Sequence, residues 1–366
     1  YVYNDGLYSL SLGALVSTDT INVSDQWEEE ESDDSGDETG VNSIDISGLT
    51  SAESMEFSVL AGASSTFDLS ALESTSGAVS GRIRANSSGA TLALNLSALS
   101  SSENNIIIRG AGLGSLDLSA LSSVVNLGLL QMNVENLSLP ALTEVSSELY
   151  IQGQGLETVN AAALISTAAL EVRGSSLTSL SMSELSTVSD ELLIVTHQAE
   201  TIDLGSLTEV LGEVTLDVGH AEVAIANLST VGTLRIQSSD GDSPFELDLS
   251  ALTEAESVLF TGLKELDSLL LGSSASIDTL TMTFTNLNDL DLSEVSQYTA
   301  LNVYCNESLV DISGLDSHSG DSALIRLWGN GLDGNWFANH SEQLTEIADL
   351  NNYNSSTLNE VYGEED

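Results

Sequence analysis

The hexapeptide LDLSAL occupies residues 116–121 and recurs, letter for letter, at residues 247–252. Looser copies, with apolar residues at the first, third and sixth positions, follow one another mostly 20–24 residues apart. A fixed period of this size is the signature of a repeat protein. The copies begin at Leu10, Ile44, Phe67, Leu94, Leu116, Leu137, Val159, Leu180, Ile202, Val223, Leu247, Leu290 and Val310, with a degenerate copy at Leu269.

Each period also contains a second alternating run, such as LYIQG from Leu149 or LEVRG from Leu170. Alternation of apolar and polar residues is typical of strands, and the Gly, Asn and Ser residues between the runs form turns. The segments between the two runs are too short for the helix of a leucine-rich repeat. We therefore expect an all-β fold, a single right-handed parallel β-helix or solenoid of about 14 coils of about 22 residues, because stacked units bury a core that one unit cannot.

The frame of LSLPALTEVSSELYIQG at residues 137–153 resembles the receptor L domain. That family comprises the β-helical, leucine-rich-like ligand-binding modules of insulin and EGF receptors, with relatives among fungal GPI-anchored cell-surface proteins. The resemblance covers roughly residues 40–330. It implies ligand binding at a cell surface, and an asparagine after the second strand of a coil, a place that Asn133, Asn306 and Asn330 fit.

Composition changes at both ends divide the chain into three expected parts. Residues 1–40 form an N-terminal coil with an acidic insertion, residues 41–327 form the L-domain-like solenoid, and residues 328–366 form a C-terminal cap and acidic tail. We expect a short helix from Ser341 within this cap, because an open solenoid end must be covered to prevent edge pairing.

The chain carries 56 acidic residues against seven Lys and Arg, a formal net charge of −49. Such a surface repels nucleic acid and anionic lipid, and no apolar run is long enough to span a bilayer. We expect no nucleic-acid partner and no membrane insertion of this segment. Screening by salt or divalent cations favours an extracellular or cell-surface location in a saline environment. The chain does not open with Met, which suggests that a leader was removed.

Two groups of acidic residues are candidate calcium sites, because calcium takes six to eight oxygen ligands. The first group lies in two loops and comprises Asp33, Asp34, Asp37, Glu38, Asp240 and Asp242. The second is an acidic stripe at the outward second position of the hexapeptide, comprising Asp45, Asp68, Asp117, Asp203, Asp248, Asp291 and Asp311. The alternative for the stripe is a solvated face of a salt-adapted protein, and for the loops a disordered acidic segment.

Catalytic signals are sparse. The four histidines are scattered, the single cysteine Cys305 lies in a strand pattern, and no nucleophile, zinc or phosphate-loop motif occurs. We expect no enzyme and no cofactor other than calcium. Eight N-x-S/T sequons are candidate glycosylation sites: Asn22, Asn86, Asn95, Asn136, Asn227, Asn306, Asn339 and Asn354.

The sequence favours a non-catalytic extracellular or cell-surface repeat protein for adhesion or ligand binding through its sheet faces. Its partner would be an extracellular protein, a carbohydrate or copies of itself. A self-assembling subunit of a fibre, sheath or surface layer is the first alternative. A β-helical carbohydrate-active enzyme is the second, which the shortage of basic residues disfavours.

Overall fold

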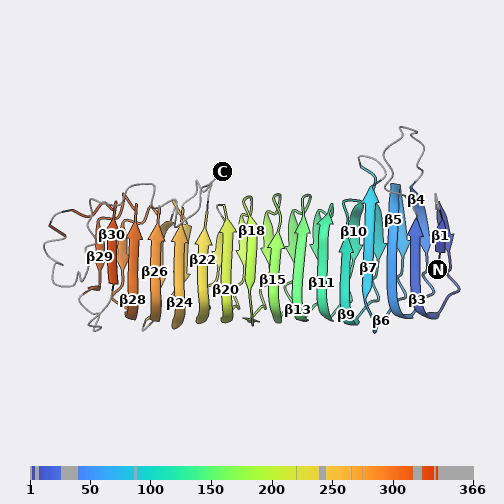
Figure 1. Cartoon of the computed structure of the whole chain (residues 1–366), viewed down its shortest axis with the longest axis horizontal. Coiled ribbons are helices and arrows are strands. Elements are labelled where there is room, and N and C mark those ends of the chain that lie inside the picture. The colour runs from blue at the N-terminus through green and yellow to red at the C-terminus, as the bar shows by residue number, and fades with distance from the viewer. Residues whose placement is uncertain are drawn as a thin grey trace. The chain divides into compact units, whose positions relative to one another are not determined.

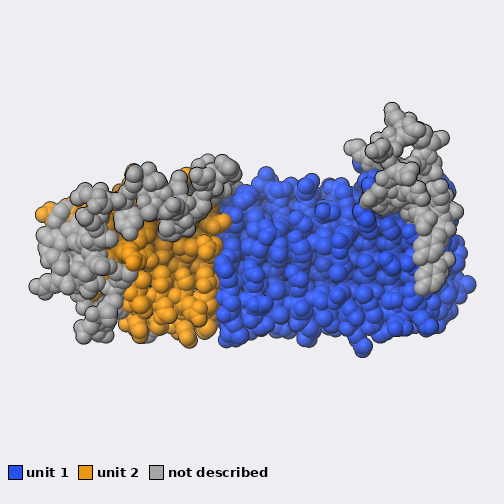
Figure 2. All heavy atoms as spheres, viewed as in Figure 1, with its two compact units in different colours: residues 1–225 blue, residues 226–366 orange. Residues whose placement is uncertain are grey.

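A computed structural model describes residues 2–4, 8–25, 40–85, 89–219, 221–238, 245–264, 266–273, 275–315, 324–333 and 335–336. The chain divides into two compact units, residues 1–225 and residues 226–366, coloured separately in Figure 2. The acidic loops at 33–38 and 240–242 and the helix expected from Ser341 lie outside the described residues. The three-part division expected from composition stays a prediction.

A long parallel ladder runs through unit 1 and forms one side of its coils (Figure 1). Successive strands pair in register, so that each coil adds one rung beside the last. The strands of this ladder are β1 (Val2–Asn4), β3 (Ser17–Asp25), β5 (Ser51–Asp68), β6 (Ser74–Thr75), β7 (Val79–Ala85), β9 (Ser101–Arg109), β11 (Ser123–Met132), β13 (Glu144–Gly153), β15 (Ser166–Arg173), β17 (Thr187–Val188), β18 (Leu192–Thr196) and β20 (Glu209–Val218).

Shorter parallel strands, which contain the hexapeptide, form a second side of unit 1. They are β2 (Ser9–Ser11), β4 (Val41–Asp45), β8 (Leu92–Asn95), β10 (Leu113–Asp117), β12 (Asn136–Ser138), β14 (Thr158–Asn160), β16 (Ser179–Ser181), β19 (Thr201–Asp203) and β21 (Glu222–Ala224). The end of β5 belongs to this side as well, since it pairs with β4 and β8.

Unit 2 repeats the arrangement. Its long ladder consists of β22 (Thr230–Gln237), β24 (Glu254–Thr261), β26 (Ala275–Thr283), β28 (Val295–Tyr304) and β30 (Leu324–Trp328). Its short strands pair as β23 (Phe245–Leu249) with β25 (Leu266–Leu271), and as β27 (Asp289–Asp291) with β29 (Asp311–Ser313).

The repeated leucines line the interior, as the hexapeptide predicts. In the copy at 247–252, Leu247, Leu249 and Leu252 are at most 1 % exposed. In the copy at 116–121, Leu118 and Leu121 are equally buried, while Leu116 stays partly exposed. Burying each such side chain stabilises the fold by about 1.5–3 kcal/mol relative to leaving it in water. The stacked leucines therefore hold neighbouring coils together.

The expected fold class is confirmed. The chain forms stacked parallel coils of about 22 residues, about 12 turns, close to the count of about 14 taken from the hexapeptide copies. Among the described residues only Asn335 and Trp336 have α-helical backbone, and Leu315 alone lies in a 3-10 turn. The helix of a leucine-rich repeat is therefore absent from the described coils.

One expected frame is wrong. The sequence aligns Val310 with Leu290, but the register pairs Leu290 with Ile312 and Asp289 with Asp311. Val310 is 57 % exposed rather than buried. A shift of two residues keeps every side chain on the same face of a strand, so alternation alone cannot fix the frame.

Candidate functional site

The acidic stripe is interrupted in unit 1. The register aligns Ser11, Asp45, Asp68, Asn95 and Asp117 in one row. A second row contains Asp203 between a serine and an alanine, with no neighbouring acid. In unit 2, Asp248 pairs with Leu270, and Asp291 pairs with Ser313 rather than with Asp311. Only Asp45 and Asp68 are adjacent stripe members.

Six of the seven stripe residues accept a hydrogen bond from the backbone N–H two residues further on, whereas Asp311 accepts one from Nε1 of Trp336 at 3.0 Å. The Oδ1 atom of Asp117 accepts from the backbone N–H of Ser119 at 3.0 Å, and Asp248 accepts from Ser250 at 2.8 Å. Asn95 accepts from Ser97 in the same way, at 3.1 Å. This is an Asx turn, which needs an acceptor oxygen and no charge. A hydrogen bond from the hydroxyl of Ser47, followed by one from its backbone N–H, lowers the pKa of Asp45, and the same two groups of Ser293 lower the pKa of Asp291.

No group of three or more His, Cys, Asp or Glu side chains among the described residues is arranged to hold a metal ion. The turn bonds give the stripe a structural role, and a calcium role stays a prediction. His197 lies with its Nδ1 atom 4.0 Å from Asp217, while the other histidines fall outside the described residues. Burial, followed by nearby Glu307, raises the pKa of the Cys305 thiol, which disfavours the reactive thiolate.

The asparagine expected after the second strand is found in unit 2. Asn306 is fully buried, and its Oδ1 atom accepts from both the N–H and the hydroxyl of Thr285. Its own N–H donates to Oδ1 of Asn330 at 3.1 Å. Asn133 is wrong for this role, because the register gives the equivalent position to Met132 and Asn133 is exposed.

The sequons differ in environment. The amide nitrogen of Asn306 donates to three acceptors in the interior, which leaves no room for a glycan in the folded chain. Asn136 is exposed, while Asn22 and Asn95 are partly buried, and Asn22 donates to Glu56. Asn227 lies in a described turn. Asn86, Asn339 and Asn354 lie outside the described residues.

The arginines share one location that the sequence did not suggest. All six project outward from long-ladder strands, between residues that point into the core. They are Arg82 and Arg84 on β7, Arg109 on β9, Arg173 on β15, Arg235 on β22 and Arg326 on β30. The chain has eight acidic residues for each Lys or Arg. If the arginines were distributed at random over the surface, most of them would have acidic neighbours. The signal was present in the alternation, since four of the six arginines directly follow a buried Ile or Val, but its meaning depends on the register between coils.

The two central outward rows of β7 to β18 in unit 1 form a surface that we call the arginine strip. Arg84, Glu103 and Glu148 also point outward from these strands but lie outside the two rows. The strip contains three arginines and one glutamate, and most of its other side chains are apolar or aromatic. The register defines its members as Ser80, Arg82, Ile107, Arg109, Gly128, Leu130, Tyr150, Gln152, Glu171, Arg173, Leu193 and Val195.

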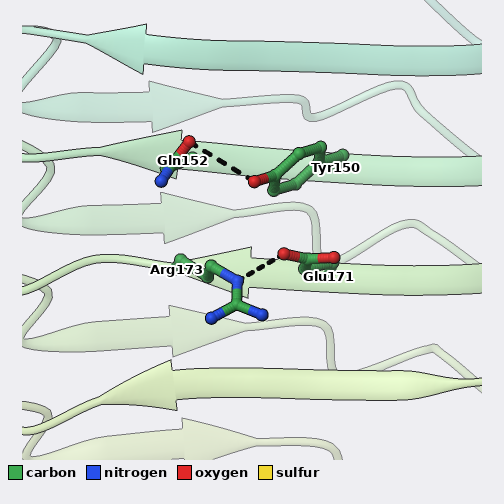
Figure 3. A network of polar contacts seen from close by, with 4 residues as sticks. All are labelled: Tyr150, Gln152, Glu171 and Arg173. Carbon is green, nitrogen blue, oxygen red and sulfur yellow. Dashed lines mark hydrogen bonds and ion pairs between the residues drawn. The ribbon is translucent and has the colours of Figure 1, made fainter.

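The centre of the strip is a polar network of four residues (Figure 3). Tyr150 and Gln152 lie on β13, directly beside Glu171 and Arg173 on β15. The Tyr150 hydroxyl donates to Oε1 of Gln152 at 3.3 Å, and Nε of Arg173 pairs with Oε1 of Glu171. Partial burial, followed by the charge of Glu171, raises the pKa of Tyr150. The charge of Glu171, the one acid of the strip, is therefore neutralised by the neighbouring Arg173.

The two central outward rows of unit 2's long ladder are free of acids, whereas Glu254, Glu256 and Asp278 lie exposed nearer the start of the same strands. The two central outward rows of β22 to β30 contain two arginines and otherwise uncharged side chains. They are Arg235, Gln237, Leu259, Thr261, Thr281, Thr283, Asn302, Tyr304, Arg326 and Trp328. These two rows therefore differ in chemistry from the acidic chain as a whole.

No protein-family model, no curated protein and no solved structure matches this chain. Within the described part, no helix is both long and apolar enough to cross a membrane.

Proposed function

We propose that the chain is a non-catalytic binding protein that engages a protein partner through the arginine strip of unit 1. The observation that supports this most is the placement of all six arginines on outward long-ladder rows of a chain whose net charge is −49. The strip shares with interface cores an enrichment in Arg and a depletion in Asp and Glu, and it carries one aromatic residue, Tyr150.

A protein partner fits the strip better than a small molecule. Parallel strands present their outward side chains in even rows, and Figure 2 shows this face of unit 1 without a deep hollow. Small ligands prefer concave sites, whereas flat surfaces with apolar and aromatic anchors suit proteins. Ile107, Leu130, Leu193 and Val195 stay partly exposed and supply apolar area.

The resemblance to receptor L domains and an extracellular, saline location belong to this proposal. The asparagine pair at Asn306 and Asn330 supports the resemblance, because it occupies the place where that family has asparagine. The excess of carboxylates supports the location, since high salt screens their mutual repulsion.

The test is a binding screen against a panel of purified extracellular proteins with two charge-matched variants. Arg109→Gln/Arg173→Gln removes two positive charges from the strip. Ser138→Glu/Ser181→Glu adds two negative charges to the short strands of unit 1, so both variants have the same net charge. We expect at least a tenfold affinity loss for the first variant and less than twofold for the second. No partner in the panel, or equal losses in both variants, would refute the proposal.

The first coil supports a second candidate, a self-assembling subunit. Leu10, Leu12 and Leu15 remain partly exposed, while the equivalent Ile44, Ile46 and Leu49 are fully buried one coil later. A second copy stacked on this coil would bury them. Light scattering between about 0.1 and 1 M salt, where the screening length falls from about 10 to 3 Å, should then show growth. If the chain remains a monomer at every salt concentration, the self-assembly candidate is wrong.

A further inference from the structure

Six outward residues on the last three long-ladder strands of unit 2 form what we call the aromatic patch. It comprises Thr281 and Thr283 on β26, Asn302 and Tyr304 on β28, and Arg326 and Trp328 on β30. The register places Thr281, Asn302 and Arg326 in one row, and Thr283, Tyr304 and Trp328 in the next. The three strands lie side by side (Figure 1).

Asn302 connects the polar members of the patch. Its Nδ2 donates to the Thr281 hydroxyl at 3.1 Å, and its Oδ1 accepts from the Tyr304 hydroxyl and from Nη1 of Arg326, both at 3.2 Å. These bonds fix the directions of a guanidinium, an amide and a phenol before any ligand arrives. Preorganised groups lose little conformational entropy on binding.

A second observation is independent of that network. The hydroxyl oxygens of Thr261 and Thr283 are both shielded from solvent and lack a hydrogen-bond partner. Thr283 is 1 % exposed, and the two residues are direct neighbours in the row that continues to Tyr304 and Trp328. Leaving a buried hydroxyl unpaired costs about 1–3 kcal/mol, so such groups call for an explanation. A ligand hydroxyl inserted along this row supplies the missing partner.

We propose that the aromatic patch binds an uncharged carbohydrate chain. The neighbouring rings of Tyr304 and Trp328 offer apolar faces on which the C–H face of a sugar ring can stack. Asn302, Arg326 and the threonine hydroxyls offer donors and acceptors for sugar hydroxyls at the ring edge. Tyr304, Trp328, Asn302 and Arg326 each retain part of their surface.

The negative charge of the chain favours a neutral sugar over an acidic one as the ligand of the aromatic patch. A net charge of −49 opposes the approach of a polyanion, and two arginines on this face do not offset it. A neutral glycan meets no such barrier, and Arg326 serves it as a planar donor already oriented by Asn302. Binding should therefore change little with salt.

The experiment measures binding of neutral mannan, β-glucan and dextran oligosaccharides to the full chain by calorimetry, with polygalacturonate and heparin as charged comparators. Trp328→Ala should weaken neutral binding at least tenfold, and Arg326→Gln about threefold to tenfold. Tyr8→Ala, at an exposed aromatic residue of unit 1 outside both proposed surfaces, should leave it unchanged. A Trp27→Phe/Trp336→Phe chain isolates Trp328 fluorescence, which should shift on binding.

Circular dichroism of each variant establishes that it is folded. Binding that persists unchanged in folded Trp328→Ala overturns the proposal. The proposal is also overturned if none of the three neutral glycans binds detectably at about 10 mM, or if only the charged polymers bind. Because the arginine strip consists of other residues, loss of protein binding there leaves this result intact.

Discussion

Leu121→Ala tests how the coils are held together. Leu121 is fully buried, and so are its equivalents one coil before and after, Leu99 and Leu142. The substitution leaves a cavity between two stacked leucines on backbones that the ladder holds in place. Leu→Ala changes in cores cost about 2–5 kcal/mol, and a site that cannot collapse belongs in the upper half of that range. We therefore expect about 3–4 kcal/mol.

The assay is urea unfolding followed by circular dichroism, together with hydrogen exchange, because repeat arrays need not unfold as one unit. Leu211→Ala is the matched control, since this side chain is 59 % exposed and its loss should cost less than about 0.5 kcal/mol. Exchange should rise first in the coils next to Leu121. A Leu121→Ala cost below about 1 kcal/mol, or equal to that of Leu211→Ala, would refute the stacked core.

Three further predictions concern single residues. Asp117→Asn should change the free energy of unfolding by less than about 0.5 kcal/mol, because Asn95 makes the same turn bond, while Asp117→Ala should cost about 1 kcal/mol; equal costs in thermal melts would contradict the turn role. Gln131 has a φ of 55°, so Gln131→Gly should stabilise the chain by up to about 1 kcal/mol; a lower melting temperature would count against this. Burial raises the pKa of Tyr298 to about 12. The folded state therefore binds the phenolic proton of Tyr298 more tightly than the unfolded state does. The contribution of this group to the free energy of unfolding is complete below about pH 10 and is lost as pH rises towards 12. With solvent screening the loss is at most about 2 kcal/mol, and Tyr298→Phe should remove this part of the alkaline decline in melting temperature.

The fold was predictable because its signal is repeated. One LxLxxL copy is weak evidence, but the copies from Leu10 to Leu290 share a period, and a period constrains the whole architecture. The serine or threonine after the hexapeptide carried a further signal. Its hydroxyl donates to the carbonyl of the equivalent residue one coil earlier, from Thr143 to Ser122 at 3.0 Å and from Thr208 to Ser186 at 3.0 Å. These bonds strengthen each corner between coils.

The surfaces were less predictable, because they depend on register. Arg82 and Arg109 are 27 residues apart in sequence yet pair directly between β7 and β9. A two-residue change in coil length would move such a pair apart without altering the apolar alternation. The same sensitivity explains why Asp311 was placed in the acidic stripe and Asn133 in the asparagine row. Core positions follow from local pattern, while neighbours on the surface follow from coil length.

Cross-linking across the strip tests the central claim most directly. In a Cys305→Ser background, Tyr150→Cys/Glu171→Cys places two thiols on directly paired residues of β13 and β15. Tyr150→Cys/Val172→Cys places the second thiol one residue further, on a side chain that points into the core. The parallel register predicts rapid disulfide formation in the first pair and none in the second. Equal rates, or faster bridging to Val172→Cys, would contradict the stacking from which both proposed surfaces are built.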